Sequence, residues 1–255
     1  MSKVELLLLD FWVSPFCMRV KIALNEKGLQ YEARPEDLFG GKSELLLNSN
    51  PIYKKVHVFL HDMKPLYEST IIVSYIDETW SSPPLLLPCS YGQAQARFWD
   101  DYIDRKVVFD TCRNIWRCKG EVPVKAKNEF IEILKQLVKD NSVVERQKLV
   151  ELERLQKIEE FEVQKIEEFD LEEALGDKEY FNGATFGFVD IIAIPLTYWF
   201  FSIEKIGGFT VTAVCPKFSR WTKRCLQRES VAKVVPEPEK VYEFVLMFRK
   251  IQGID

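Results

Sequence analysis

A short apolar run near the start of the chain is followed at once by a proline turn and a helical pattern. Residues 6–9 are all leucine, which suits one buried strand, and residues 18–24 have helical character just after Pro15. Ser14 stands at the junction, where a helix begins with unpaired backbone N–H groups and the positive end of its dipole. That environment suits an anion such as a thiolate. The sequence therefore predicts a strand–turn–helix unit whose corner hydroxyl could donate a hydrogen bond to a sulfur.

The first third of the chain alternates between strand-like and helix-like segments. We expect strands at 4–11, 30–34 and 56–61, the last forming a hairpin through a turn at 62–65, and helices at 19–27 and 69–78. Gly28 should end the first helix, and Ser69 should cap the second. This β-α-β, β-β-α order is the thioredoxin-like plan.

The remainder of the chain has a different pattern. Residues 81–88 are proline-rich and begin with two serines, which is typical of a linker. Beyond them apolar residues such as Phe98, Trp99 and Tyr102 recur at helical spacing, and no segment has convincing strand character. We therefore expect an α/β half followed by an all-helical half.

Composition limits the classes of function. The net charge is -4 and no basic cluster is present, so a nucleic-acid surface is not expected. No stretch approaches the roughly twenty apolar residues of a membrane span. Six cysteines are scattered through a chain with two histidines, a usage typical of a reduced cytosolic protein rather than of a disulfide framework or a metal site.

Residues 139–170 differ from their surroundings. They contain no glycine or proline, six Lys/Arg and ten Asp/Glu, and the hexapeptide at 156–161 recurs at 164–169. Strong helix formers and a repeat offset of eight residues indicate a duplicated, exposed helical insertion. A packed coiled coil, a solvated helix and a partly disordered arm all remain open for it.

Sequence motifs in this order resemble the plant tau class of cytosolic glutathione transferases. They are found at 10–16 (DFWVSPF), 42–47 (KSELLL), 50–56 (NPIYKKV), 67–69 (YES), 75–78 (YIDE), 96–99 (ARFW), 186–190 (FGFVD) and 215–218 (CPKF). The resemblance implies a thioredoxin-like glutathione-binding domain at 1–81, a linker at 82–92 and an all-helical domain with an electrophile pocket at 93–255. It also implies a cytosolic homodimer that conjugates glutathione, as co-substrate and without another cofactor, to hydrophobic electrophiles in detoxification and stress responses.

Ser14 resembles the catalytic serine of that family. Its hydroxyl would donate a hydrogen bond to the glutathione sulfur and lower the pKa of the thiol, so that thiolate exists near neutral pH. The thiolate, and not the serine, would then attack the electrophile. The alternative is that Ser14 is an ordinary helix N-cap.

Five further residues match the family's glutathione site. Lys42 and Lys55 resemble the cations that reach the glycyl carboxylate, and Val56 resembles the residue whose backbone pairs with the cysteinyl unit. Glu68 and Ser69, at the start of a helix, would hold the γ-glutamyl end.

His57 departs from the family pattern, which has a cis-proline at this position. A cis bond before a residue other than proline costs roughly 3–4 kcal/mol, and a trans bond would turn the Val56 backbone away from the ligand. We therefore expect a weakened glutathione site, and tighter binding by a His57→Pro variant. Cys17 suggests a redox alternative, but relatives with that chemistry place cysteine at the Ser14 position, and here Cys17 should face the interior.

The electrophile pocket should lie between the two halves. By resemblance and aromatic character its residues would be Phe11, Trp12, Phe16, Arg19, Phe109, Arg113, Trp116, Trp199, Phe244 and Phe248. Gly187 and Asp190 have the spacing of a capping box, which indicates a role in folding.

A rival function is a non-catalytic carrier of small hydrophobic molecules, favoured by His57 and by the acidic insertion. Ser14, Glu68 and Ser69 favour the enzyme, because a carrier has no evident need of them. A third possibility is that the insertion reflects an unusual gene model and that the chain folds poorly.

Overall fold

The computed structural model describes residues 5–139 and 179–255. Its N-terminal half is built on a four-stranded sheet in the order β2-β1-β3-β4, in which β1 runs parallel to β2 and antiparallel to β3. The strands are β1 (Leu6–Asp10), β2 (Glu32–Pro35), β3 (Val58–His61) and β4 (Lys64–Leu66). The expected strands and hairpin are thus present, with β1, β2 and β3 each starting two residues later than predicted.

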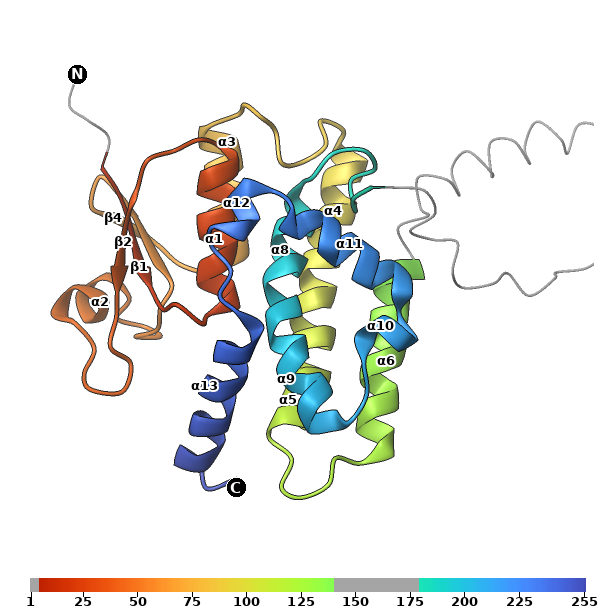
Figure 1. Ribbon diagram of the computed structural model, residues 1–255. Coiled ribbons are helices and arrows are strands. Elements are labelled where there is room, and N and C mark those ends of the chain that lie inside the picture. Colours follow the sequence, from red (N-terminus) through yellow and green to blue (C-terminus); the bar gives the residue numbers. More distant parts are fainter. Residues whose placement is uncertain (1–4, 140–178) are drawn as a thin grey trace, which may run out of the picture.

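Helices cover both faces of this sheet, as Figure 1 shows. They are α1 (Pro15–Glu26), α2 (Glu44–Ser49) and α3 (Ser69–Thr79). Leu6 and Leu8 pack in the large core with α1 and α3, whereas Leu7 and Leu9 pack with Leu46 of α2. Side chains alternate between the faces of a strand, so an all-leucine strand is stable only where both faces are covered.

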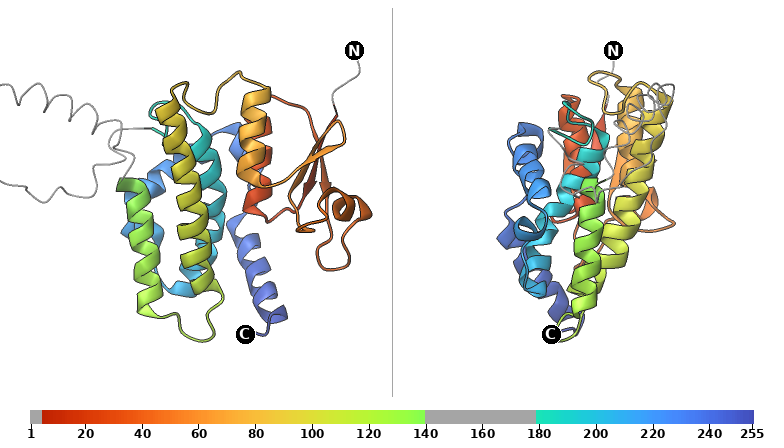
Figure 2. Two further views of the ribbon diagram at one scale, coloured as in Figure 1. Left: turned by 180° about the vertical axis from the view of Figure 1, so that it is seen from behind. Right: turned by 90° about the vertical axis from the view of Figure 1, so that its right-hand side faces the viewer.

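In the part that the structure describes, the regular elements of the C-terminal half are all helices, and the only β pairing is two isolated bridges within residues 180–185. Its elements are α4 (Ser90–Tyr102), the π-helix η1 (Ile103–Cys112), α5 (Arg113–Trp116), α6 (Val124–Lys139), α8 (Phe188–Ala193), the 3-10 helix η3 (Ile194–Leu196), α9 (Thr197–Gly207), α10 (Val211–Val214), α11 (Pro216–Leu226), α12 (Glu229–Ala232) and α13 (Pro238–Ile251). Helix α13 packs on α9 and lies below α1, between the sheet and the helical half (Figures 1 and 2).

The connection between the halves is held tightly. The carboxylate of Asp77 accepts hydrogen bonds from the backbone N–H groups of Leu85 (2.8 Å) and Leu86 (3.0 Å). The same carboxylate forms a buried ion pair of 2.6 Å with Lys27, which also donates to the carbonyl of Pro83. The stretch expected to be a linker is therefore fixed to both α1 and α3.

Asp190 is fully buried at the start of α8 and has the predicted structural role. Its carboxylate accepts from the backbone of Gly187 (3.0 Å) and Phe181 (3.0 Å) and from the indole of Trp221 (2.7 Å). Three donors on one carboxylate join the start of α8 to α11.

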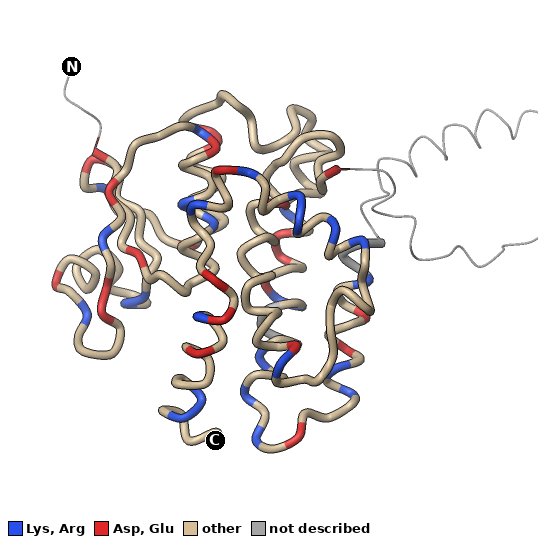
Figure 3. Tube along the Cα trace, in the orientation of Figure 1, with Lys and Arg blue, Asp and Glu red and all other residues tan. Residues whose placement is uncertain are grey.

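Nearly all of the acidic insertion, residues 140–170, lies outside the described residues, so the alternatives for it stay open. Elsewhere charged residues are spread over helices and loops (Figure 3). Among the described helices, none combines the length and the hydrophobicity that a membrane crossing requires.

Candidate functional site

Four segments that carry expected glutathione contacts begin or end at one edge of the sheet. In the strand register Leu9 is opposite both Arg34 and Val58, and Phe59 is opposite Leu66. The chain therefore leaves β1 and β2, enters β3 and leaves β4 at the same edge. The loops that hold Ser14, Lys42, Val56 and Ser69 adjoin these four strand ends.

Ser14 is the N-cap of α1. Its Oγ accepts a hydrogen bond of 3.3 Å from the backbone N–H of Cys17, and its own N–H donates to the Phe11 carbonyl at 2.8 Å. The side chain is half-buried. Capping uses only the oxygen lone pairs, so the hydroxyl hydrogen is free to donate to a ligand sulfur.

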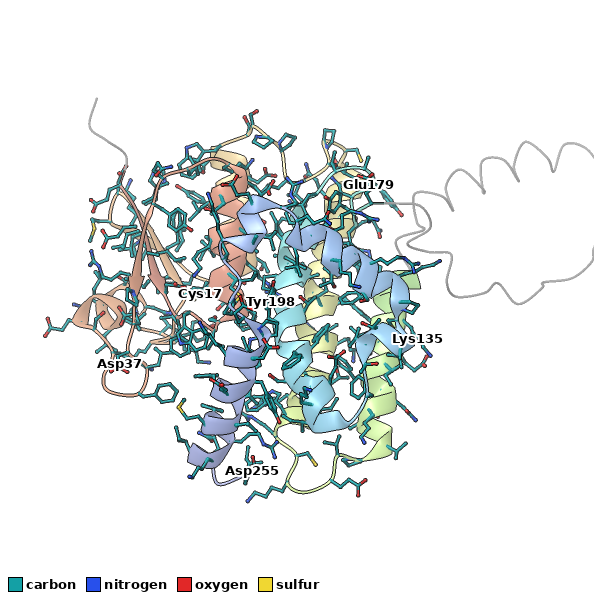
Figure 4. All side chains as sticks on the ribbon, in the orientation of Figure 1. Cys17, Asp37, Lys135, Glu179, Tyr198 and Asp255 are labelled. Atoms are coloured by element: carbon teal, nitrogen blue, oxygen red, sulfur yellow. The ribbon has the colours of Figure 1, made fainter. Side chains whose placement is uncertain are left out.

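Cys17 lies in the first turn of the same helix, where Figure 4 labels it, and it faces the interior as expected. The thiol is fully buried and its sulfur accepts from the backbone N–H of Phe11 at 3.4 Å. Burial, with a smaller contribution from the charge of Asp10, raises the pKa of Cys17 to about 12. The thiol is therefore protonated at neutral pH and is a poor nucleophile.

The start of α3 differs from expectation in one respect. Glu68 occupies the cap position with a φ of 65°, no side-chain cap bond is formed there, and Ser69 is the first helical residue. The hydroxyl of Ser69 instead accepts from Nη1 of Arg19 at 3.2 Å. Glu68 is exposed, and Ser69 is buried.

Arg19 is fully buried where the two halves meet. It donates to the carbonyl of Ile192 (2.9 Å) and forms an ion pair of 2.7 Å with Asp104 of η1. Its guanidinium also lies 5.0 Å from the ring centre of Phe16. Arg19 was expected in the electrophile pocket, but these contacts hold it, with Phe16, in the junction beneath the site.

The segment before β3 carries Lys55, Val56 and His57. Asn50 holds this segment by donating from its amide to the carbonyl of Lys55 at 3.0 Å, and the Val56–His57 peptide is cis. The His57 ring is buried, neither ring nitrogen has a hydrogen-bond partner, and the ring centre lies 6.1 Å from that of Phe16. Burial, and to a lesser extent the charge of Arg19, lowers the pKa of His57 to about 4. The imidazole is therefore neutral at physiological pH.

A hollow of about 560 Å³ opens beside this edge, between the N-terminal half and α13. Its lining residues are Phe11, Trp12, Phe39, Lys240, Glu243, Phe244 and Met247. The ring centre of Phe244 lies 5.8 Å from Phe11, 5.9 Å from Trp12 and 6.2 Å from Phe39. Phe39 is a wall residue that sequence reasoning missed.

The other expected aromatic residues continue this cluster away from the opening. Phe248 stacks on Phe244 at 6.1 Å and lies 5.7 Å from Trp116, which lies 6.3 Å from Trp199. The indole of Trp199 donates to the Val13 carbonyl at 3.0 Å. Six expected rings thus meet in one cluster: Phe11, Trp12, Trp116, Trp199, Phe244 and Phe248.

Of the other expected pocket residues, Arg19 and Phe16 lie at the junction described above, which leaves Arg113 and Phe109. Arg113 is exposed on α5, and the side chain of Phe109 lies outside the described side chains. Lys42 is likewise exposed, just before Ser43 caps α2. In the described ranges no group of three or more His, Cys, Asp or Glu side chains is arranged to hold a metal ion.

Arg249 joins α13 to the end of α5, beside the inner part of the aromatic cluster. It is buried and donates to the carbonyls of Trp116 (2.5 Å) and Cys118 (3.2 Å), while its other contact is an ion pair with Asp255. The helix that carries Phe244 and Phe248 is therefore fixed to the end of α5, where Trp116 stands.

Two sequence models match this chain. One is described as "Glutathione S-transferase, N-terminal domain" and matches residues 4–78; the other is described as "Glutathione S-transferase, C-terminal domain" and matches residues 138–229. Glutathione S-transferase U28 of Arabidopsis thaliana is 45% identical over 253 residues, which cover 98% of this chain and 97% of the relative. The chain belongs to the glutathione S-transferase family.

Solved structures indicate the class of transferase. Rice GST1, solved in complex with glutathione, is 41% identical with a TM-score of 0.77, and the match covers 98% of each chain. A Tau class glutathione S-transferase from mango is 35% identical with a TM-score of 0.76, over 95% of this chain and 98% of that one. The transferase is thus of the plant tau class, with a thioredoxin-like domain followed by a helical domain.

Proposed function

We propose that this transferase conjugates reduced glutathione to hydrophobic, aromatic electrophiles. The observation that carries the proposal is the position of Ser14, a half-buried hydroxyl at the N-terminus of α1, next to an aromatic hollow. The family supports a role in detoxification, and a serine-stabilised thiolate needs no other cofactor.

The sheet edge offers groups suited to each part of glutathione. The exposed cations Lys42 and Lys55 suit the glycyl carboxylate, and the Val56 backbone suits the cysteinyl amide. Ser69 and Glu68, where α3 begins, suit the γ-glutamyl carboxylate and ammonium. Rice GST1, solved with glutathione, supports the same class of ligand here.

The chemistry follows from one hydrogen bond. The Ser14 hydroxyl donates to the glutathione sulfur, which stabilises the thiolate over the thiol and lowers the thiol pKa. The thiolate forms a carbon–sulfur bond with the electrophile, and the leaving group, where there is one, departs with the electron pair. Ser14 gives up no proton and forms no covalent bond.

The aromatic rings around the hollow supply the second substrate site. Flat electrophiles would contact Phe11, Trp12 and Phe244, with Trp116 and Phe248 deeper in the cluster. Ring-to-ring contacts in offset or edge geometry contribute about 0.5–1.5 kcal/mol each beyond burial of their area. The site therefore favours planar aromatic substrates.

We also propose a homodimer that acts in the cytosol. Exposed apolar side chains in the α2–β3 loop and on α3 and α4 support a second copy as partner: Ile52, Tyr53, Ile71, Tyr91 and Phe98. The six cysteines, all unpaired, support a reducing compartment. Sedimentation equilibrium of the wild type and of a Tyr53→Ala, Phe98→Ala variant tests the assembly. The wild type should be a dimer, and the variant should dimerise more weakly.

The proposed activity is tested by conjugation of glutathione to 1-chloro-2,4-dinitrobenzene, with Ser14→Ala as the control. We expect a rate above background that falls by about 100-fold or more in the variant. A well-folded wild type without activity would contradict the proposal. If such a protein still bound aromatic ligands, the rival carrier function would replace it.

A further inference from the structure

The loop between β2 and α2, residues 36–43, is closed at its base by one carboxylate. Glu36 is buried, and its two oxygens accept from the backbone N–H of Ser43 (3.1 Å) and from the hydroxyl of Ser43 (2.6 Å). The N–H of Glu36 donates to the Asp10 carbonyl at 2.9 Å, which fixes this base to β1. The loop is therefore anchored at both ends to the framework that carries Ser14.

A second carboxylate shapes the tip of the loop. Asp37 Oδ1 accepts from the backbone N–H groups of Phe39 (2.9 Å) and Gly40 (2.7 Å). A Cβ at Gly40 would stand 2.2 Å from Asp37 Oδ2, and Gly41 has a φ of 145°, which side chains rarely adopt. This Asx turn turns the chain so that the ring of Phe39 projects from the loop.

Phe39 faces the hollow from the side opposite α13. Its ring centre lies 6.3 Å from Phe11 and 6.2 Å from Phe244, and it lines the hollow. Even so, 53% of the side chain is exposed. This ring therefore has apolar surface that its own protein does not bury, next to two rings that are partly covered.

The same loop also carries Lys42, three residues after Phe39. A carboxylate bound at Lys42 would restrain the short segment between them. Ordering of a loop by one ligand lowers the entropic cost for a second ligand that uses the same loop. The two substrate sites thus share one short, two-carboxylate loop.

We propose that Phe39 is a specificity-determining residue for flat aromatic electrophiles, and that the 36–43 loop makes aromatic binding tighter once glutathione occupies Lys42. This inference rests on the proposed function, since it names a further contact and a coupling within the same site. Asp37 acts here as a positioning residue, because it holds Phe39 through the backbone.

The specificity half is tested with two electrophiles, 1-chloro-2,4-dinitrobenzene and the small non-aromatic acrolein. Phe39→Ala should raise the KM for the aromatic substrate about fivefold and change the KM for acrolein by less than about twofold. Val124→Ala, an exposed apolar residue on α6 away from the hollow, is the control for loss of surface area. An equal change for both electrophiles, or none, would overturn the assignment.

The positioning role of Asp37 is tested by comparing two variants. Asp37→Asn keeps an oxygen that accepts from the Phe39 and Gly40 N–H groups, so its aromatic KM should stay near that of the wild type. Asp37→Ala removes the acceptor and should reproduce the selective rise seen with Phe39→Ala. If Asp37→Asn and Asp37→Ala have the same KM for the aromatic substrate, the Asx turn does not position the ring of Phe39.

The coupling is measured by binding rather than by turnover. N-phenyl-1-naphthylamine, a neutral fluorescent aromatic, should bind the wild type about threefold more tightly with saturating glutathione than without. In Phe39→Ala glutathione should leave its Kd unchanged, and an unchanged Kd in the wild type would refute the coupling. A wild type that conjugates nothing yet shows the Phe39-dependent effect would remove the proposed reaction and leave this inference standing.

Discussion

Nη2 of Arg19 lies 2.7 Å from Oδ1 of Asp104, and this ion pair joins the first helix of the sheet half to the π-helix of the helical half. The arginine is fully buried, and its remaining donors reach Ser69 and the Ile192 carbonyl. One side chain thus connects the start of α3, the end of α8 and η1 where the two halves meet.

Arg19→Met should lower the free energy of unfolding by about 3 kcal/mol, because it strands the groups that the guanidinium satisfies. Arg34→Met removes an exposed pair with Glu32 and should change it by less than about 0.5 kcal/mol. Chemical denaturation of both variants checks the difference. Equal stability of the two would show that the buried ion pair contributes no more than the exposed one.

Ser14→Asp separates helix capping from thiolate stabilisation. Aspartate caps a helix as well as serine does, so the variant should retain the stability of the wild type, whereas Ser14→Ala should lose about 1 kcal/mol. An ionised aspartate has no hydrogen to donate to sulfur, so conjugation should be lost in both variants. The pKa of bound glutathione, read from thiolate absorbance, should rise in each. An active Ser14→Asp variant would rule out the hydroxyl as the donor.

His57 should make the free energy of unfolding depend on pH. Its pKa is lowered from about 6.5 to about 4, so between these values the unfolded chain binds a proton that the folded state rejects. The stabilisation is complete above pH 6.5 and falls by about 3 kcal/mol as the pH drops to 4. Asp100 and Asp190, whose pKa values are raised to about 6, act in the opposite direction.

The His57 contribution is isolated by a difference measurement. His57→Asn keeps Asp100 and Asp190. Subtracting its free energy of unfolding from that of the wild type at each pH therefore removes the effect of the two aspartates. The difference should be constant above pH 6.5 and decline below it. A difference that stays flat down to pH 4 would mean that the imidazole titrates normally in the folded protein.

Arg249→Met should loosen the attachment of α13 to α5. The carbonyls of Trp116 and Cys118 lose their donor, so we expect a loss of about 2 kcal/mol in stability and a rise of several-fold in the KM for aromatic electrophiles. The KM for glutathione should change by less than about twofold, because the residues proposed to contact glutathione lie on the other half. Lys250→Met, an exposed neighbour, is the control. An unchanged KM for aromatic electrophiles would show that Arg249 does not affect the aromatic hollow.

Much of the fold could be predicted because its signals are local. Four consecutive leucines, a proline turn and a glycine-ended helix fix β1 and α1 within a few residues, and Ser14 follows from that corner. The aromatic wall was also predictable as a set, since the resemblance points to residues such as Phe11 and Phe244 that do meet.

The rest depends on contacts between distant parts of the chain. Arg19 finds Asp104 eighty-five residues away, and nothing near either residue indicates the pairing. Serine at the start of a helical pattern predicts a helix cap, but the hydroxyl of Ser69 instead accepts a hydrogen bond from Arg19. Phe39 stands in a glycine-rich loop, and only the Asx turn of Asp37 in three dimensions directs its ring into the hollow.

The attachment of residues 82–86 to Asp77 and Lys27 affects how this protein can be taken apart. A protease needs an extended, accessible stretch, and here the backbone between the halves donates to a buried carboxylate while its proline carbonyl accepts from a buried lysine. Limited digestion should therefore spare this connection, despite its proline-rich composition, and the N-terminal half should not be recoverable as a separate fragment. Dissection into single domains would expose the apolar surface that α1 and α3 share with the helices, and each piece would aggregate.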